Sequence, residues 1–163
     1  MKTISFSKLF VGAALCWCAV AAHAQVPQYG PNVSYEQARK ALDSAIAEAR
    51  KQNLPMAVAV VDTAGQLVAF ERLDNTQTGS TMAAQDKAVS AAMYRRSTKA
   101  FQDALAGGGA GLRVLTLRGA NAVEGGLPIV VDGKIIGAIG VSGGSTEQDG
   151  LVAKAATDAM AAK

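Results

Sequence analysis

The residues best placed to receive an anion lie at a strand-to-helix junction, where residues 140–149 read GVSGGSTEQD. Backbone N–H groups at the start of a helix attract carboxylates and phosphates. The candidates for such a site are Gly143, Gly144, Ser145 and Thr146. The same segment also suits a capping box, in which Ser145 pairs with Gln148 or Thr146 with Asp149. Because the glycines fit neither the Walker nor the dinucleotide spacing, a capped helix start and an anion site both remain open.

Cationic side chains on an earlier helix are the other candidates for binding an acid. Lys87 has alanines at helical spacing around it, which either leave space for an acidic ligand or let the lysine extend over them to water. Arg95 and Arg96 follow Tyr94 at the end of the same helix. Two arginines clamp a carboxylate only if they converge, and otherwise they interact with the negative end of the helix dipole.

Residues 1–24 have the layout of a secretory signal peptide. Lys2 and Lys8 precede or begin an apolar run, and Ala22-His23-Ala24 supplies the small residues of a cleavage site. The run is too short to span a bilayer comfortably. We therefore expect cleavage after Ala24 and a periplasmic or secreted protein without stable membrane insertion.

Cleavage would remove Cys16, Cys18 and His23, the only cysteines and the only histidine of the chain. The mature chain would then lack disulfides, thiolate nucleophiles, histidine-zinc centres and a Ser-His-Asp triad. Its carboxylates have no metal-loop spacing, so no dedicated catalytic or metal machinery is expected. The signal also holds two of the 16 basic side chains and none of the 13 acidic ones. The net charge falls to about +1, which argues against a nucleic-acid surface.

The elements that position these residues follow from the apolar periodicity. Residues 25–33 are predicted as an irregular lead-in and residues 34–163 as one domain. Helices are predicted at 34–53, 80–94 and 145–162, with a short helix ending near residue 105. Two antiparallel hairpins are predicted, at 56–62 with 67–72 and at 127–131 with 134–141, the second turning at Asp132-Gly133. The glycine-rich residues 107–113 are expected to form a mobile loop.

An antiparallel sheet covered by helices is the simplest arrangement of these elements, an α+β or α/β/α sandwich. Gly137 and Gly140 lie inside the last strand and predict the close approach of a helix or backbone. The apolar residues of two helices are expected to face the core: in the first helix Ala38, Leu42, Ala45, Ile46 and Ala49, and in the last helix Leu151, Val152, Ala155, Ala159 and Met160.

The succession of segments resembles the GlcG/HbpS family, the haem-degrading domain family that also includes the C-terminal domain of PduO-type proteins. The segments that carry the resemblance cover most of the mature chain: EQAR at 36–39, PMAVAVVD at 55–62, GQLVAF at 65–70, DK at 86–87, YRR at 94–96, GGLPI at 125–129, GAIGVSGG at 137–144 and EQD at 147–149. The resemblance implies a profilin-like α/β/α fold with a five-stranded antiparallel sheet. It also implies a homo-oligomer that binds haem or a related tetrapyrrole.

One departure from the family concerns the haem iron, which some relatives ligate through histidine. A mature chain without histidine would need another ligand, and tyrosine, methionine and lysine are the alternatives. The candidates are Tyr94, Lys87, Met82 and Met93 on the second helix and Tyr29 and Tyr35 near the start. Arg95, Arg96 or Lys87 would pair with the haem propionates.

Three hypotheses follow for the function. The first is an exported haem-binding protein in haem or iron handling or oxidative protection, in which any haem breakdown is chemistry of the bound haem. The second is a periplasmic module that binds or converts a small carboxylate through the 143–146 backbone with Lys87 or Arg95. The third is a structural oligomer without a small ligand, whose alanine- and glycine-rich surfaces allow close subunit packing.

Overall fold

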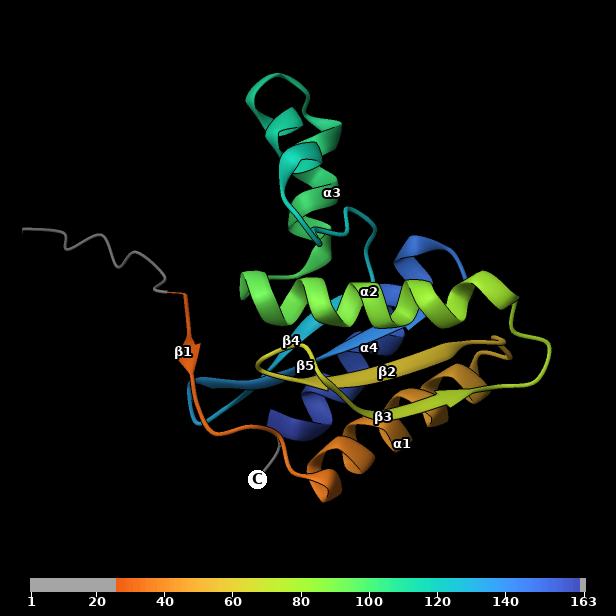
Figure 1. The fold of residues 1–163 in the computed structure, drawn as a ribbon. Helices are drawn as coiled ribbons and strands as arrows, with labels where there is room; N and C mark the ends of the chain where they lie inside the picture. Colours follow the sequence, from red (N-terminus) through yellow and green to blue (C-terminus); the bar gives the residue numbers. More distant parts are fainter. Residues whose placement is uncertain (1–25, 162–163) are drawn as a thin grey trace, which may run out of the picture.

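Five strands form one sheet in the computed structural model, which describes residues 26–161 (Figure 1). The long strand β5 (Lys134–Ser142) pairs antiparallel with both β4 (Gly126–Val131) and β2 (Ala57–Asp62), and β2 pairs antiparallel with β3 (Leu67–Arg72). The two predicted hairpins are confirmed. The fifth strand, β1 (Gln28–Tyr29), lies in the predicted lead-in and runs parallel to β5. The predicted signal peptide, residues 1–24, lies outside the described residues.

Helices cover both faces of the sheet, which confirms the α/β/α arrangement. Helices α1 (Tyr35–Lys51) and α4 (Thr146–Ala161) pack on one another and on one face, and α2 (Thr78–Tyr94) lies across the other face (Figure 1). The core is accordingly divided into two clusters, one beneath α1 and α4 and a smaller one beneath α2. No helix within residues 26–161 is long and apolar enough to cross a bilayer.

Helix α1 forms as its sequence predicts. Ser34 caps its start, accepting a hydrogen bond from the Gln37 N–H, while the Gln37 side chain accepts one from the Ser34 N–H at 2.9 Å. All five apolar residues predicted for its inner face are buried. The inner face of α4 was predicted in part. Val152 and Met160 are buried as predicted, whereas Leu151 is 56% exposed and Ala155 and Ala159 are only partly buried. The buried face of α4 also includes Asp149, Ala153 and Ala156.

Glycines allow α2 to lie directly on the sheet. A Cβ at Gly140 in β5 would lie 2.0 Å from the Ala84 carbonyl oxygen, and one at Gly126 in β4 would lie 2.4 Å from the Lys87 carbonyl oxygen. The predicted close approach at Gly140 is therefore confirmed, and α2 is the approaching helix. At Gly137 the approaching backbone belongs to Val61 of the neighbouring strand β2.

A helical arm projects from the body beyond α2 (Figure 1). It consists of α3 (Thr98–Ala106) and a 3-10 helix, η1 (Gly109–Thr116). The prediction of a loop at 107–113 is therefore wrong for most of that segment. The physical reason is the close packing that Gly111 permits, because a Cβ there would lie 1.8 Å from the Ala104 carbonyl oxygen of α3. Glycine here brings two helical turns together instead of loosening the chain.

The second hairpin turns as predicted. Asp132 and Gly133 both have positive φ, at 48° and 74°, which is the conformation that a two-residue type I′ turn requires. Strand β5 packs directly against α2, and the junction into α4 follows it. The tertiary arrangement thus brings Lys87 of α2 into contact with the 140–149 segment.

Candidate functional site

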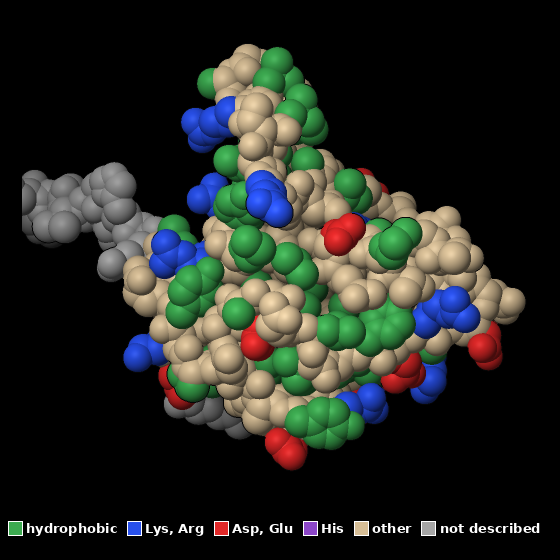
Figure 2. Space-filling model, viewed as in Figure 1, with side chains coloured by type: hydrophobic (Ala, Val, Ile, Leu, Met, Phe, Trp, Pro, Cys, Tyr) green, Lys and Arg blue, Asp and Glu red, His purple; other side chains and the backbone are tan. Residues whose placement is uncertain are grey.

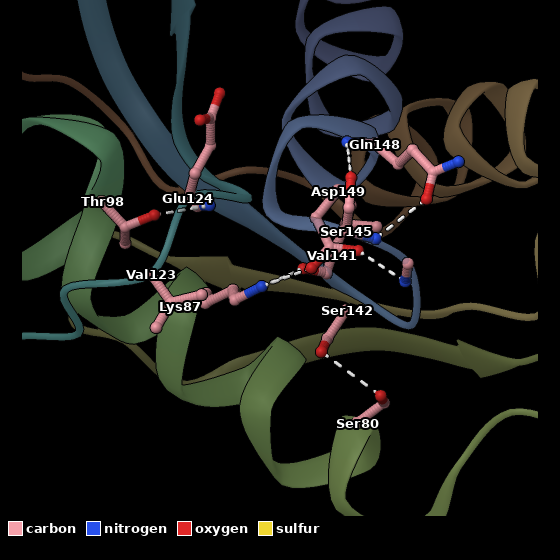
Figure 3. Close-up of polar contacts among 12 residues, drawn as sticks. Ser80, Lys87, Thr98, Val123, Glu124, Val141, Ser142, Ser145, Gln148 and Asp149 are labelled. Atoms are coloured by element: carbon pink, nitrogen blue, oxygen red, sulfur yellow. Dashed lines mark hydrogen bonds and ion pairs between the residues drawn. The ribbon is translucent and has the colours of Figure 1, made fainter. Parts of the chain in front are cut away.

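Lys87 is buried, with only 2% of its side chain exposed. Its Nζ donates a hydrogen bond to Asp149 Oδ2 at 2.6 Å and another to the Val141 carbonyl oxygen at 3.0 Å (Figure 3). The surface lysine considered from the sequence is therefore not observed. The ammonium instead has a charged partner inside the protein.

The junction before α4 uses its backbone N–H groups internally. Gly144 donates to Asp149 Oδ1 at 3.0 Å, and Ser145 donates to Gln148 Oε1 at 2.9 Å, while Ser145 Oγ accepts from the Gln148 N–H at 3.3 Å (Figure 3). This is the capping box predicted for Ser145 and Gln148, and Thr146 begins the helix. A side chain at Gly143 would collide with the Pro55 carbonyl oxygen, 2.3 Å from the position of its Cβ. The structure favours the capped helix start over an anion site.

Burial dominates the electrostatics of Asp149. Loss of solvent raises the pKa of its carboxyl above the ordinary value, although the Lys87 ammonium and the Gly144 N–H act in the opposite direction. Desolvation penalises the ionised form, whereas a nearby cation and hydrogen-bond donors favour it. Asp149 therefore holds its proton more tightly than a carboxyl in water does.

The two adjacent arginines diverge. Arg95 ends α2 in the left-handed conformation, its Cζ lies 5.5 Å from the centre of the Tyr29 ring, and its Nη1 donates to Gln28 Oε1 at 3.2 Å. Arg96 points to the arm, where its Cζ lies 5.5 Å from the centre of the Phe101 ring. The converging clamp considered from the sequence does not form, because each guanidinium is placed over a different aromatic ring.

A pocket of about 560 Å³ lies between α3, η1 and the end of α2. Two of the residues named from the sequence, Tyr94 and Arg96, line it together with Phe101 and Arg113. The Tyr94 and Phe101 rings meet edge to face, with centres 5.2 Å apart, and the Tyr94 hydroxyl donates to the Arg118 carbonyl oxygen at 2.7 Å. We call this the arm pocket. It combines one phenol, two guanidiniums and an apolar wall.

The other candidate iron ligands lie elsewhere. Met82 and Met93 are 67% and 53% exposed on α2, Tyr35 is 62% exposed on α1, and none of the three lines the arm pocket. The Tyr29 hydroxyl donates to the Ala92 carbonyl oxygen at 2.8 Å. Across residues 26–161 no cluster of three or more His, Cys, Asp or Glu side chains is arranged to hold a metal ion.

Sequence reasoning did not identify Arg113 and Phe101 as site residues. Arg113 lies in the segment predicted to be a loop, and no pattern in the sequence indicated that this segment folds back on α3. The apolar spacing of α3 would have placed Phe101 on a buried face, but not beside Tyr94. Only the packing of η1 on α3 makes a pocket from them.

Comparisons with proteins of known sequence agree on one family. A family model described as haem degrading protein HbpS-like matches residues 33–158. An uncharacterized 15.0 kDa protein from the dhaT-dhaS intergenic region of Citrobacter freundii is 34% identical over 128 residues, covering 77% of this chain and 90% of the relative. Protein GlcG of Escherichia coli K12 is 40% identical over 95 residues, covering 58% of this chain and 69% of GlcG.

Solved structures show the same relationship. Klebsiella pneumoniae ORFY has a TM-score of 0.73 and 29% identity, covering 82% of this chain and 93% of that one. A PduOC:haem complex has a TM-score of 0.71 and 28% identity, covering 78% and 94%. A double mutant of Streptomyces reticuli HbpS has a TM-score of 0.72 and 28% identity, covering 85% and 94%. Sequence and fold together show that this chain belongs to the HbpS-like family of haem degrading proteins, which includes GlcG.

Proposed function

We propose that this protein is an exported haem-binding protein and that the arm pocket is its tetrapyrrole site. The observation that carries the proposal is the convergence of Tyr94, Arg96 and Phe101 on one pocket. Family membership and the haem complex of the relative PduOC support haem as the ligand. The pocket volume of about 560 Å³ lies within the range of small-molecule and cofactor sites.

The residues of the arm pocket fit the parts of a haem. A phenol oxygen is an established ligand of haem iron, and Tyr94 supplies the one phenol of this pocket. Guanidiniums form strong charge-assisted hydrogen bonds with carboxylates, and Arg96 and Arg113 supply two of them for the propionates. Phe101 and Val114 supply apolar surface for the porphyrin.

The residues of the arm pocket would bind and orient the haem. Bound haem supplies iron and redox chemistry. Tyr94 is held by its ring contact with Phe101 and by its hydrogen bond to the Arg118 carbonyl oxygen. Coordination of iron would replace that hydrogen bond. The function in the cell would be haem or iron handling, or protection against oxidative damage.

The proposal also includes export of the chain and cleavage of its signal peptide after Ala24. They are supported by the composition of residues 1–24, with lysines, an apolar run and the Ala22-His23-Ala24 segment. N-terminal sequencing of the protein recovered from the periplasm or medium tests this part, and the expected first residue is Gln25.

The small-carboxylate hypothesis has less support. It relied on the 143–146 backbone, Lys87 and Arg95. Of these, Lys87, Arg95 and the N–H groups of Gly144 and Ser145 have partners within the protein. The arm pocket could accept an acid through Arg96 and Arg113, but a small carboxylate would leave its aromatic wall unused. Haem uses both the charged and the apolar side of the pocket.

A hemin titration followed by Soret absorbance tests the proposal. The chain should begin at Gln25, because Cys16, Cys18 and His23 would offer adventitious ligands. We expect a saturable shift with defined stoichiometry, and Tyr94→Phe should alter the position of the Soret band. Tyr35→Phe is the matched control, because Tyr35 is exposed on α1. A non-saturable response, or the same spectrum in Tyr94→Phe as in wild type, would contradict the assignment.

A further inference from the structure

A second pocket lies where the start of α3, the chain leading into β4 and helix α4 meet, and it shares no lining residue with the arm pocket. Its volume is about 360 Å³, within the range of small-molecule sites. We propose that this pocket binds a small organic cation, a primary ammonium with a short apolar body, through the Glu124 carboxylate. We call it the α4 pocket, and its charged and large apolar lining residues are Lys99, Glu124, Leu127, Lys154 and Asp158.

The Glu124 carboxylate is the charged group of this pocket that lacks a partner. Its side chain is partly buried, and within residues 26–161 it accepts no hydrogen bond and forms no ion pair. The Lys99 ammonium attracts it only at longer range. The Glu124 backbone N–H donates to Gln102 Oε1 at 2.8 Å, and the side chain points away from Lys87 (Figure 3). A carboxylate that has lost part of its water gains most from a charged hydrogen-bond donor.

Gly150 makes room for this carboxylate. It lies inside α4, where glycine is less favourable than alanine by up to about 1 kcal/mol. A Cβ at Gly150 would lie 2.4 Å from Glu124 Oε1 and 2.9 Å from Glu124 Cδ. The Glu124 side chain therefore lies against the helix in space that any other residue at this position would fill.

The two lysines of the α4 pocket already have carboxylate partners. Lys99 Nζ lies 2.7 Å from Asp103 Oδ1, and Lys154 Nζ lies 2.7 Å from Asp158 Oδ1. Together with the unpaired Glu124, three carboxylates therefore stand against two ammoniums. The pocket and its ion pairs carry an excess of one negative charge.

Neighbouring charges do not cancel this excess. Glu147, which is exposed at the start of α4, also attracts the Lys99 ammonium and adds a further negative charge. Beneath the pocket, Lys87 is paired with Asp149, so this buried pair adds no net charge. The local potential therefore favours a cationic ligand over an anionic one.

The lining of the pocket favours an organic cation over a metal ion. Hard metal ions need several oxygen ligands, and the described part of the chain groups no three His, Cys, Asp or Glu side chains for one. An alkylammonium carries its N–H donors at one end, where Glu124 accepts them. Its carbon body would lie on Leu127, the large apolar side chain of the lining.

The first test is an NMR titration of the purified protein with benzylammonium, followed by the backbone amide signals. Benzyl alcohol and benzoate are the matched neutral and anionic ligands. We expect benzylammonium to give saturable shifts at residues 124–127 and at Gly150, and benzoate to give none there. Hydrophobic side chains also gather over the projecting arm (Figure 2), and benzyl alcohol measures adsorption to such surfaces. Absence of saturable shifts with benzylammonium, or equal affinity for all three ligands, would overturn the proposal.

Two variants test the role of the carboxylate. Glu124→Gln should weaken benzylammonium binding about tenfold, because it removes the charge from the hydrogen bond. Glu36→Gln is the matched control: it removes the same charge from an exposed position on α1 and should bind like wild type. Unchanged affinity in Glu124→Gln, or an equal loss in Glu36→Gln, would refute the assignment.

Gly150→Ala should also weaken binding, because the added methyl displaces the Glu124 carboxylate. The carboxylate is the far end of a flexible side chain, so we expect no fall in the unfolding temperature. Unchanged affinity in this variant would refute the placement of the ligand beside Gly150. The inference does not rest on the proposed haem site, and hemin titration is a separate readout, so the two sites can fail independently.

Discussion

Lys87 Nζ lies 2.6 Å from Asp149 Oδ2, and the two side chains are only 2% and 4% exposed. The residues are 62 positions apart in sequence and join α2 to the first turns of α4. The additional hydrogen bond from Lys87 to the Val141 carbonyl oxygen includes β5 in the same contact. The pair therefore fixes two helices on opposite faces of the sheet relative to one another.

Removal of the lysine charge should destabilise the protein strongly. Lys87→Met keeps an apolar stem of similar length but leaves Asp149 without its cation, and breaking a buried pair in this way costs about 3–5 kcal/mol. Urea unfolding measures the loss. The control is Lys154→Met, whose ion pair with Asp158 is 63% exposed on both sides and is expected to contribute at most about 1 kcal/mol. Equal losses in the two variants would show that burial of the Lys87 pair has no energetic consequence.

The carboxyl of Asp149 should titrate at a higher pH than an ordinary aspartate carboxyl does. Burial raises the pKa of this carboxyl above its ordinary value of 3.8, so the folded state binds the proton more tightly than the unfolded chain does. Its contribution to the free energy of unfolding is therefore fully present below pH 3.8 and is lost as the pH rises through the pKa of the folded state. Carboxyl ¹³C chemical shifts followed by NMR report the midpoint directly.

Lys87→Met should raise the pKa of Asp149 further, because the ammonium lowers it in wild type. The same NMR titration applies to this variant under conditions in which it remains folded. A midpoint below 3.8 in wild type, or a lower midpoint in Lys87→Met, would contradict this account of the electrostatics.

Gly140→Ala should separate α2 from the sheet. The added methyl would lie 2.0 Å from the Ala84 carbonyl oxygen and 2.5 Å from the Ala88 nitrogen, and overpacking of this kind costs about 1–3 kcal/mol or more. Gly79→Ala is the control, because beyond its chain neighbours and the adjacent helix backbone nothing lies within 4 Å of the added methyl. Alanine is also favoured over glycine inside a helix by up to about 1 kcal/mol. The temperature of thermal unfolding should therefore fall in Gly140→Ala and rise in Gly79→Ala.

The divergence of Arg95 and Arg96 predicts unequal roles in hemin binding. Arg96→Ala removes a guanidinium from the arm pocket, and loss of one charge-assisted hydrogen bond weakens binding about tenfold. Arg95→Ala removes a guanidinium that lies over Tyr29, outside that pocket, and should leave the affinity unchanged. Fluorescence quenching during hemin titration compares the two. A larger loss of hemin affinity in Arg95→Ala than in Arg96→Ala would indicate instead that hemin binds on the β1 side of α2.

Local patterns in the sequence determined most of the secondary structure. The apolar spacing of α1, the Ser34 cap and the Asp132-Gly133 turn depend on neighbours within a few residues, and each was predicted correctly. The antiparallel hairpins followed for the same reason. The family was also visible in the sequence, because its segments occur in order along most of residues 34–160.

Tertiary contacts decided the site. The burial of Lys87 depends on Asp149 and on the Val141 carbonyl, more than 50 positions away, and no local pattern distinguishes such a lysine from one that extends to water. The flexibility of glycine predicts a loop at Gly111. In the structure, the small size of Gly111 instead allows η1 to pack on α3, and this packing creates the arm pocket. Whether a glycine loosens the chain or permits close packing depends on what approaches it, and only the folded structure shows that.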